Sequence, residues 1–341
     1  MGSSRAVRVT AGFSIDELTF DSVEVAPPGR QQVLVAIKAV SLNYRDLLVV
    51  TGKYNPHLPK PIVICSDAAG EVVAVGEDVK NFKPGDRVIG SFFQNWYDGE
   101  LDRDVAPSAL GGSIDGVLAG ERVFDARGLV HLPAHLGYEE GATLPCAAVT
   151  AWNGMITTAH LKSGDAVLLL GTGGVSIFGL QFALMHGART IITSSSEEKL
   201  ARAKALGAHE TINYTKTPEW QKEVLRLTGG RGVDVVLEVG GTGTLGRSLR
   251  AVRPSGQVSL IGVLAGINDP LNIGMILHNA IRVQGIYVGS VATFEEMNRA
   301  ITLHKMKPVV DRTFTFDGTR EALRYMQSGS HFGKILINLA D

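Results

Sequence analysis

A glycine-rich turn between apolar runs is the part of this sequence best suited to chemistry. The run from Val167 to Leu170 predicts a buried strand, and the turn G-T-G-G-V-S follows from Gly171 to Ser176. Gly171 allows a tight turn, and Gly173, which lacks a Cβ, lets the backbone approach a pyrophosphate. A helix that begins here offers unpaired N–H groups and a positive dipole end to that anion. The turn therefore predicts a dinucleotide-binding site.

The residues after the turn support this interpretation. Apolar residues recur at helical spacing from Ile177 to Met185, and a second apolar strand is expected from Thr190 to Thr193. Strand, glycine turn, helix and strand make the βαβ unit of dinucleotide-binding folds. Ser176 stands at the third glycine position, where we expect a small side chain to be tolerated. An ordinary strand-to-helix turn without a ligand is the alternative.

The end of the second strand predicts which dinucleotide binds. An NAD site usually places a carboxylate here to bind the ribose 2′-OH. This chain instead has Thr193 followed by three serines, with Glu197 as the first carboxylate, then Lys199 and, further on, Tyr214. Hydroxyl groups and a lysine suit a 2′-phosphate, so the sequence predicts a preference for NADP over NAD.

The same serines also fit the start of a helix. Ser194 with Glu197, or Ser195 with Glu198, would form a capping box. This second interpretation does not exclude phosphate binding, and both can hold together.

Composition excludes several classes of protein. A chain of 341 residues favours two domains. Its net charge of -1 gives no reason to expect nucleic acid or an anionic membrane surface as a partner. No apolar run approaches the length that spans a membrane, and no secretory signal is found at the start. Cys65 and Cys146, the two cysteines, exclude a disulfide scaffold. We therefore expect a cytoplasmic protein.

The first part of the chain, 5–127, predicts a compact β domain and possibly a barrel. Short β runs alternate with turns such as K-P-G-D at Lys83. The expected strands are Val33 to Val40, Gly70 to Val75, Asp86 to Ile89 and Leu129 to Leu132. Between the first two lies Ser41 to Pro61, which we expect to begin as a short helix and to end in a loop suited to active-site residues.

The second part predicts a doubly wound parallel sheet. We expect a helix from Glu139 to Thr158, and strands that alternate with helices after it. Further expected strands are Thr211 to Asn213, Val233 to Glu238, Gln257 to Ile261 and Ile281 to Tyr287. Expected helices are Leu200 to Leu206, Trp220 to Leu227, Thr244 to Val252 and, near the end, Thr319 to Gln327. A last strand from Lys334 to Leu339 is expected to return to the first domain.

Several motifs along the chain carry a family resemblance. They are N-Y-R-D from Asn43, S-D-A-A-G-E-V-V-A-V-G from Ser66, K-P-G-D-R-V from Lys83, L-P-C-A-A-V-T-A-W from Leu144, G-T-G-G-V-S from Gly171 and H-F-G-K-I-L-I from His331. With these motifs the chain resembles the medium-chain dehydrogenase/reductase superfamily over essentially its whole length. The resemblance implies a GroES-like β-barrel catalytic domain, 1–146 and 288–341, and a Rossmann domain, 147–287, with the cofactor between them.

The residues at the family's zinc positions predict that this chain holds no zinc. By the resemblance, Asn43 stands where zinc alcohol dehydrogenases have a cysteine, and Ser66 stands where they have the histidine of G-H-E. A catalytic zinc needs about three protein ligands, and only Cys146 and Asp67 remain. Cys146 is then expected to be a buried, small apolar residue. Arg45 stands at the position of the hydroxyl residue that relays protons in alcohol dehydrogenases.

The zinc-free branch of quinone and enoyl reductases fits the sequence better. That branch has N-x-x-D followed by G-x-Y, matched by Asn43, Asp46, Gly52 and Tyr54. The resemblance implies Tyr54 as a proton donor near the nicotinamide, or else as a tyrosine that lines the cleft. It implies that Asn43 orients the substrate or the nicotinamide ribose, or else caps a helix. Asp46 is expected to hold the loop by accepting from N–H groups.

The resemblance also implies a set of residues that bind NADP(H). These residues are Thr150, Gly171, Gly173, Gly174, Val175, Ser194, Ser195, Lys199, Tyr214, Val239, Gly262, Val263, Tyr287, Val288, Phe332 and Lys334. It implies a homodimer as well, in which the strand Ile281 to Tyr287 pairs with its twin.

The function that follows is NADPH-dependent transfer of hydride to a quinone or an activated alkene. These acceptors already have low-lying orbitals, so positioning can supply much of the catalysis without a metal. Two alternatives stay open: a zinc-independent alcohol dehydrogenase or carbonyl reductase, and a nucleotide-binding protein with a structural or sensing role.

Overall fold

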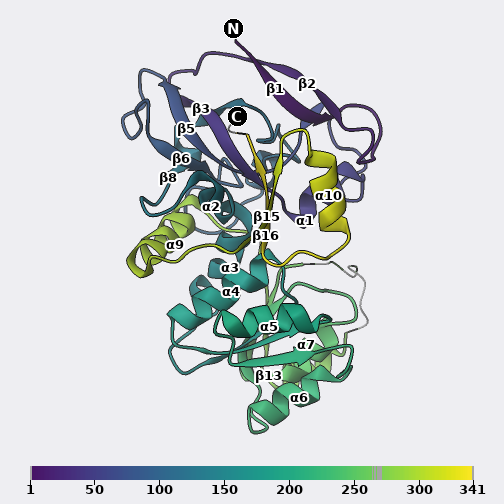
Figure 1. Ribbon diagram of the computed structural model, residues 1–341. Coiled ribbons are helices and arrows are strands. Elements are labelled where there is room, and N and C mark those ends of the chain that lie inside the picture. The colour runs from purple at the N-terminus through teal and green to yellow at the C-terminus, as the bar shows by residue number, and fades with distance from the viewer. Residues whose placement is uncertain (1, 263, 265, 267–270, 340–341) are drawn as a thin grey trace. The chain divides into compact units, whose positions relative to one another are not determined.

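The structure, a computed structural model, describes residues 2–262, 264, 266 and 271–339, which form two compact units (Figure 1). Unit 1 consists of Met1–Val149 and Gly289–Asp341, and unit 2 consists of Thr150–Val288. The chain therefore leaves unit 1 once and returns to it at its end.

Unit 1 is built on β-sheets. Within its described residues one sheet has the order β2-β1-β4, and a larger sheet has the order β15-β16-β3-β5-β6-β8, with β7 paired to β3. The strands are β1 (Gly2–Val9), β2 (Thr19–Val25), β3 (Gln32–Ser41), β4 (Ile62–Val63), β5 (Asp67–Val75), β6 (Arg87–Gly90), β7 (Glu121–Asp125), β8 (Leu129–His131), β15 (Val310–Thr315) and β16 (Lys334–Asn338). Antiparallel pairing of Leu336 with Ser41 joins β16 to β3, so the last strand returns to the first part of the chain as the sequence predicts.

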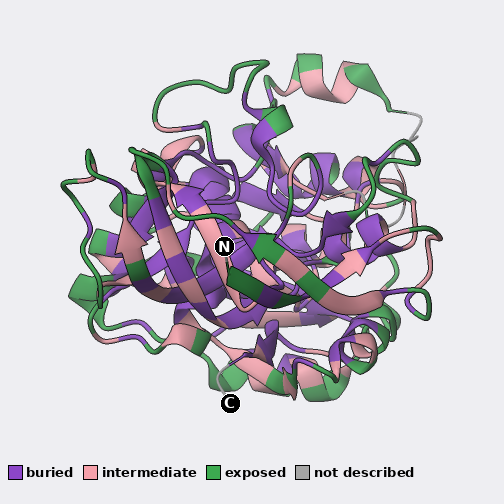
Figure 2. Cartoon of the chain, turned by 90° about the horizontal axis from the view of Figure 1, so that it is seen from above, coloured by how far each residue is buried: buried purple, intermediate pink, exposed green. Residues whose placement is uncertain are grey.

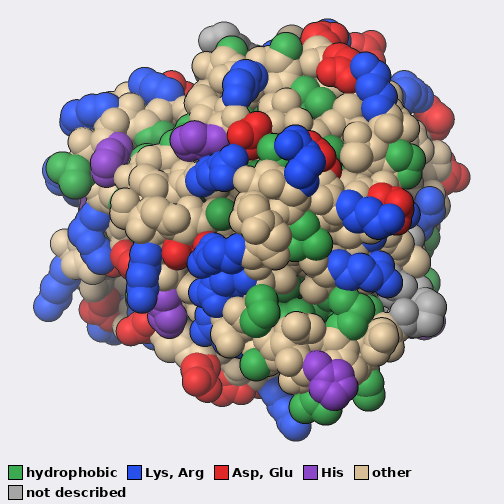
Figure 3. All heavy atoms as spheres, turned by 90° about the horizontal axis from the view of Figure 1, so that it is seen from below, with side chains coloured by type: hydrophobic (Ala, Val, Ile, Leu, Met, Phe, Trp, Pro, Cys, Tyr) green, Lys and Arg blue, Asp and Glu red, His purple; other side chains and the backbone are tan. Residues whose placement is uncertain are grey.

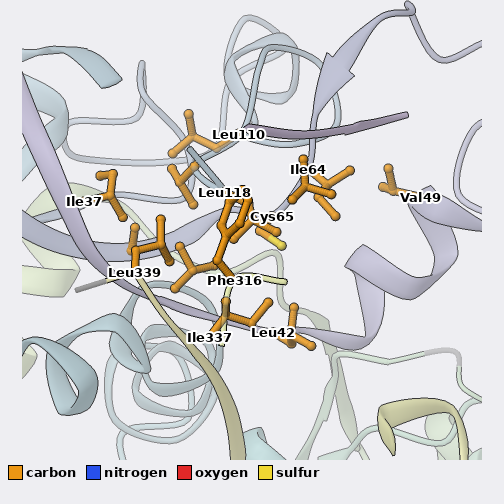
Figure 4. Packing of buried hydrophobic residues seen from close by; sticks show 14 of the residues in the cluster. Ile37, Leu42, Val49, Ile64, Cys65, Leu110, Leu118, Phe316, Ile337 and Leu339 are labelled. Carbon is orange, nitrogen blue, oxygen red and sulfur yellow. The ribbon is translucent and has the colours of Figure 1, made fainter. Parts of the chain in front are cut away.

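In β3 more and less buried residues alternate along most of the strand, and Figure 2 shows strands with buried and less buried residues along their length. This alternation follows from the two-residue period of a strand that has one face in a core. In that core Cys65 is fully buried and lies among Leu118, Ile64 and Phe316 (Figure 4). Cys65, and not Cys146, is therefore the thiol that packs as a small apolar residue, since Cys146 is only half-buried.

Short helices complete unit 1. They are α1 (Tyr44–Val50), α2 (Tyr138–Ala142), α9 (Val291–His304) and α10 (Thr319–Gln327), with short 3₁₀ helices at Ala106–Ser108 and Ala126–Gly128. The helix expected from Glu139 to Thr158 is not continuous, because π-helical turns at Leu144–Ala148 and Asn153–Thr157 interrupt it on either side of α3 (Val149–Trp152). The sequence analysis did not predict the strands β1, β2, β4, β7 and β15 or the helix α9, nor the helix at Ile273–His278 in unit 2.

Unit 2 contains the doubly wound parallel sheet that the sequence predicts. Its described strands have the order β11-β10-β9-β12-β13-β14, and every pair is parallel. They are β9 (Ala166–Leu169), β10 (Arg189–Ser194), β11 (Glu210–Asn213), β12 (Val233–Glu238), β13 (Val252–Leu260) and β14 (Arg282–Gly285). The chain order reverses between β9 and β12, and ligands of such sheets bind beyond the carboxyl ends of the strands at this point.

Helices connect the strands of unit 2. They are α4 (Gly174–Met185), α5 (Glu197–Ala205), α6 (Trp220–Leu227), α7 (Leu245–Ala251) and α8 (Ile273–His278). Leu168, Val236 and Val258, on three neighbouring strands, are fully buried in the core of this unit. In the part of the chain that the structure describes, no helix has the length and apolar character needed to cross a membrane.

Candidate functional site

The glycine turn leads directly from β9 into α4, at the point where the strand order reverses. Gly171 has φ +74°, which favours glycine, and its N–H donates to Thr193 Oγ1 at 3.2 Å. Gly173 is the N-cap of α4 and has no side chain to satisfy the first N–H groups of the helix. A Cβ added at Gly173 would meet no atom within 4 Å, so the backbone lies open there. This geometry fits a bound pyrophosphate.

At the third glycine position the structure accommodates the small side chain of Ser176, as expected. Ser176 is buried, and its hydroxyl donates to the carbonyl of Leu170 at 2.7 Å. It is thus tied to the end of the strand. The close approach of helix and sheet occurs one turn later at Gly179, where an added Cβ would lie 2.5 Å from Leu237 Cδ1 and 2.9 Å from Leu169 Cδ2.

The residues expected to bind a 2′-phosphate lie at the ends of β10 and β11. These strands pair in parallel, and the N–H of Tyr214 donates to the carbonyl of Ser194 at 3.1 Å. Ser194 is buried, whereas Ser195 and Tyr214 are exposed and Lys199 is half-buried. The adjacent ends of the two strands therefore bring these four predicted residues into one region.

Neither predicted capping box forms in α5. The N-cap is Ser196, whose hydroxyl accepts from the N–H of Lys199 at 3.3 Å. Glu197 does not reach back to the cap but forms an ion pair with Lys216 at 2.7 Å and accepts from Asn213 Nδ2 at 2.7 Å. These hydrogen bonds, that of Lys216 first, lower the pKa of Glu197. The carboxylate of Glu197 thus binds Lys216 and Asn213 rather than the serines.

Glu238, at the end of β12, was not predicted as a site residue. It is fully buried, and its Oε1 accepts from the N–H of Gly240 at 2.8 Å, from the N–H of Gly241 at 3.1 Å and from Thr244 Oγ1 at 2.7 Å, while Oε2 accepts from Ser248. Buried carboxylates persist only with such partners. An acidic residue at a strand end followed by two glycines was the signal that could have indicated this role.

The loop that Glu238 organises contains predicted cofactor residues. Val239 and Gly262 follow neighbouring strands, and an added Cβ at Gly262 would lie 2.3 Å from the carbonyl oxygen of Val239. Only glycine fits at this approach. Val263, the next predicted residue, lies outside the described residues.

Three predicted residues lie at the two ends of unit 2 along the chain. Thr150 is buried in α3, and Tyr287 is 39% exposed. Val288 has φ +58°, which is unusual for a β-branched residue, and its carbonyl accepts from Asn153 Nδ2 at 2.7 Å. The role of these three residues in cofactor binding stays a prediction.

In unit 1 a buried lysine holds Asn43. Lys334 is 3% exposed, and its ammonium group donates to Asn43 Oδ1 at 2.6 Å and to the carbonyl of Leu42 at 2.7 Å. Asn43 Nδ2 lies 3.4 Å from Ser66 Oγ. The carboxamide of Asn43 is therefore oriented by partners from β16 and from the start of β5.

Two buried carboxylates flank this group. Asp67 Oδ2 lies 4.0 Å from the ammonium of Lys334 and accepts from the N–H of Cys146 at 3.0 Å, while its Oδ1 accepts from Ser66 Oγ at 2.7 Å. Burial raises the pKa of Asp67, and the charge of Lys334 opposes this. Asp46 accepts from the N–H of Asn43 at 2.8 Å, as expected for a residue that holds the loop. Burial raises the pKa of Asp46 to about 6.

The donors at the family's zinc positions do not fit a metal ion here. Asn43 and Asp67 already have the ammonium of Lys334 as their cation. Burial also raises the pKa of Cys146, which disfavours the thiolate that binds metals. Among the described residues no group of three or more His, Cys, Asp and Glu side chains is placed to hold a metal ion. The absence of zinc stays a prediction.

Tyr54 and Phe332 differ in their exposure. Tyr54 lies after α1 in a segment without regular structure and is 38% exposed, and its ring faces the guanidinium group of Arg45. Phe332 is buried in unit 1. Exposure makes Tyr54 the residue of this pair that a substrate can reach.

Comparison with known proteins identifies the family. The family model described as zinc-binding dehydrogenase matches residues 174–303, and that of the alcohol dehydrogenase GroES-like domain matches residues 29–134. A zinc-type alcohol dehydrogenase-like protein of Schizosaccharomyces pombe is 46% identical over 96% of each chain. An acryloyl-coenzyme A reductase of Sulfurisphaera tokodaii is 27% identical over 96% of each chain. A chloroplastic quinone oxidoreductase of Triphysaria versicolor is 29% identical over 92% of each chain.

Solved structures agree with this fold. A protein of Sinorhizobium meliloti 1021 has a TM-score of 0.92 and 39% identity, with 99% of each chain covered. The structure of an NAD-dependent alcohol dehydrogenase has a TM-score of 0.90 and 33% identity, covering 98% of this chain and 100% of the other. The predicted combination of a Rossmann sheet and a GroES-like domain is confirmed. The chain belongs to the medium-chain dehydrogenase/reductase superfamily of oxidoreductases.

Proposed function

We propose that this protein is an NADPH-dependent oxidoreductase that reduces a quinone or an α,β-unsaturated carbonyl compound without zinc. Unit 1 would be the catalytic domain and unit 2 the nucleotide-binding domain. The observation that carries the zinc-free part is the buried ammonium of Lys334 beside Asn43 and Asp67. A metal ion would have to displace this internal cation, and the two positive charges would repel each other.

The residues of unit 2 fit a dinucleotide that carries a 2′-phosphate. Gly173, Gly174 and Val175 would hold the pyrophosphate with the free N–H groups of α4, and Val239 and Gly262 would line the nicotinamide side. Ser194, Ser195, Lys199 and Tyr214 would hold the 2′-phosphate. When bound, the cofactor would supply a hydride to the substrate.

In unit 1 Tyr54 would donate a proton to the reduced substrate. Its exposure supports this role, because a proton donor must reach the reacting group. Asn43 would orient the carbonyl group of the substrate or the nicotinamide ribose through its fixed carboxamide. Lys334 would support Asn43 rather than bind the cofactor alone, since its ammonium is bonded within unit 1.

A second candidate function is NAD-dependent alcohol oxidation. Its support is the similarity to proteins named zinc-type alcohol dehydrogenase-like and NAD-dependent alcohol dehydrogenase. The residues at the zinc positions disfavour it, because an alkoxide would lack a Lewis acid. A nucleotide-binding protein with a sensing role stays the third candidate.

The test is a panel of acceptors with the purified protein. We expect NADPH oxidation with 9,10-phenanthrenequinone or trans-2-hexenal, and little with hexanal, its saturated counterpart. Elemental analysis should find less than a tenth of a zinc ion per chain, and a chelator should leave the activity unchanged. Turnover of hexanal that a chelator abolishes, with about one zinc per chain, would favour the alcohol dehydrogenase. Tight NADPH binding without turnover of any acceptor would favour a sensing role.

We also propose a cytoplasmic homodimer. Within the described sheet β14 pairs only with β13, and its outer edge is exposed. In the neighbouring α8, no residue is buried, and Ile273 and Leu277 are 75% and 76% exposed. Figure 3 shows one face of the molecule, on which exposed hydrophobic side chains lie near Lys and Arg side chains. A free strand edge beside exposed apolar residues suits pairing with a second copy.

A further inference from the structure

The guanidinium group of Arg45 lies against two aromatic rings in unit 1. Arg45 is the second residue of α1, and its Cζ lies 4.9 Å from the ring centroid of Tyr54 and 4.7 Å from that of Phe92. Its Nη1 donates to the carbonyl of Leu110 at 2.6 Å. The planar group is thus held by a helix, by an aromatic ring from a second segment and by a backbone carbonyl.

This position is costly for an arginine. Its Nε and Nη2 are buried and have no hydrogen-bond partner, and in the part of the chain that the structure describes Arg45 forms no ion pair. A charged donor that is buried without an acceptor destabilises the fold. The charge of the neighbouring Asp46 interacts with that of Arg45. Its Oδ2, however, accepts a hydrogen bond from the N–H of Asn43. The burial of the Arg45 side chain is therefore not explained by a contribution to the stability of the fold.

The loop after Leu110 leaves room for the guanidinium group. A Cβ added at Gly112 would lie 1.9 Å from Nη2 of Arg45. A side chain at position 112 would therefore require the guanidinium group of Arg45 to move. What distinguishes Arg45 from another buried arginine is its contact with the partly exposed ring of Tyr54.

The guanidinium group of Arg45 contacts the ring of Tyr54, which is partly exposed. Tyr54 lies in an irregular segment, is 38% exposed, and its backbone N–H donates to the carbonyl of Leu48 at 3.1 Å. A ring that is partly surrounded by solvent can change its rotamer, whereas stacking against a fixed guanidinium group restricts it.

We propose that Arg45 is a positioning residue that holds the ring of Tyr54 in the orientation from which its hydroxyl reaches the substrate. This inference rests on the proposed role of Tyr54 as proton donor. Misplacement of a reacting group by about 1 Å lowers a rate by up to about 100-fold. Loss of Arg45 therefore lowers kcat, while the substrate still binds.

Unit 1 offers a matched control in Arg122. Its Cζ lies 5.3 Å from the ring centroid of Phe124, its Nη1 donates to the carbonyl of Gly116 at 2.9 Å, and its Nε is buried without a partner. Arg122 thus shares with Arg45 a ring contact, a carbonyl acceptor and a buried, unpartnered Nε, but its ring partner is Phe124 and not Tyr54. Its replacement tests what the loss of a buried arginine does by itself.

The experiment compares Arg45→Gln, Arg45→Lys and Arg122→Gln with 9,10-phenanthrenequinone and trans-2-hexenal at saturating NADPH. We expect Arg45→Gln to lower kcat about tenfold or more and to change KM less than about threefold. Arg45→Lys should recover only part of the loss, because an ammonium group cannot stack as a plane. Arg122→Gln should lower the melting temperature and leave kcat within about twofold. An equal loss of kcat in the Arg45→Gln and Arg122→Gln variants would overturn the proposal.

A double-mutant cycle tests whether Arg45 acts through Tyr54. In a Tyr54→Phe background, Arg45→Gln should change kcat less than about twofold, because the hydroxyl that Arg45 positions is gone. If Arg45→Gln still lowers kcat about tenfold in this background, Arg45 acts on the substrate directly and the proposal is wrong.

A readout without turnover separates this inference from the proposed function. The protein can be labelled with 3-fluorotyrosine, and the ¹⁹F resonance of Tyr54 assigned through Tyr54→Phe. Arg45→Gln should shift and broaden this resonance, whereas Arg122→Gln should leave it unchanged. A shift without turnover of any acceptor would support the positioning of Tyr54 and refute the proposed function, and an unchanged resonance would refute the positioning itself.

Discussion

Replacing Lys199 with alanine is expected to weaken NADPH binding about tenfold and to leave NADH binding nearly unchanged. Lys199 is the third residue of α5, and its N–H donates to the N-cap Ser196. It therefore lies at the positive end of the helix dipole, beside the end of β10, where a 2′-phosphate would be bound. NADH has no such phosphate, so its binding should not depend on Lys199.

The magnitude follows from the exposure of Lys199. A charge-assisted contact is worth about 1.5–3 kcal/mol, or roughly ten- to a hundredfold in affinity. Lys199 is half-buried, so solvent screening moves the expectation to the lower end, about tenfold. Glu197, in the same turn of the helix, weakens this little, because it forms an ion pair with Lys216.

The assay is a fluorescence titration of both cofactors at two salt concentrations. Lys204→Ala is the matched control, because Lys204 carries the same charge in the last turn of the same helix. The loss of NADPH affinity in Lys199→Ala should shrink as salt rises, since salt screens the contact in the wild type. Wild-type preference for NADH, equal weakening of both cofactors, or an equal effect of Lys204→Ala would refute the assignment of Lys199.

Three further predictions concern stability and assembly. Because the pKa of Asp46 is raised to about 6, the unfolded chain loses this proton at a lower pH than the folded chain, and the free energy of unfolding should fall as pH rises from about 4 to 6. Urea unfolding at pH 4 and 7 should show that the wild type loses about 3 kcal/mol more over this range than Asp46→Asn, and equal losses would contradict the raised pKa. Gly179→Ala should destabilise the protein by about 1–3 kcal/mol through overlap with Leu237, whereas Gly246→Ala, in a helix with nothing within 4 Å, should be neutral or slightly stabilising, as thermal unfolding can measure. Light scattering at micromolar concentration should report a dimer, which Leu277→Glu should weaken, and a wild-type monomer would exclude the proposed pairing through β14 and α8.

Periodicity predicted the regular elements of this protein well. The helix from Thr319 to Gln327 has the predicted bounds, because its buried Ala322, Leu323 and Met326 recur at helical spacing. The helix α9 carries the same kind of signal, with Phe294, Met297 and Ile301 buried, and it was missed although Ser290 is a clear N-cap. In β1 the buried residues alternate with arginines, and this pattern was passed over.

Local sequence could not determine the start of α5. Three successive serines precede it, and each can accept from an N–H group two or three residues later. The choice of cap depends on residues outside this segment. Asn213, at the end of β11, and Lys216, just after it, bind Glu197 and keep it from forming the second half of a capping box. Tertiary contacts thus determine which of the three serines caps the helix, since the three are similar in their local free energy.

The contacts that organise the candidate sites connect residues far apart in the chain. Lys334 is bonded to Asn43 across 291 positions, and no spacing in the sequence indicates which lysine will be buried. Glu238 in unit 2 is a more local case, since its four donors follow within ten residues. Both are buried charges with several partners, and removing a partner from such a group is costly in a low-dielectric interior. Each charge therefore fixes its neighbours before any ligand binds: Lys334 orients the carboxamide of Asn43, and Glu238 sets the loop that carries Val239. On this argument Asn43 and the loop that carries Val239 are held in place before a ligand binds, and the contact with Arg45 would do the same for the exposed ring of Tyr54.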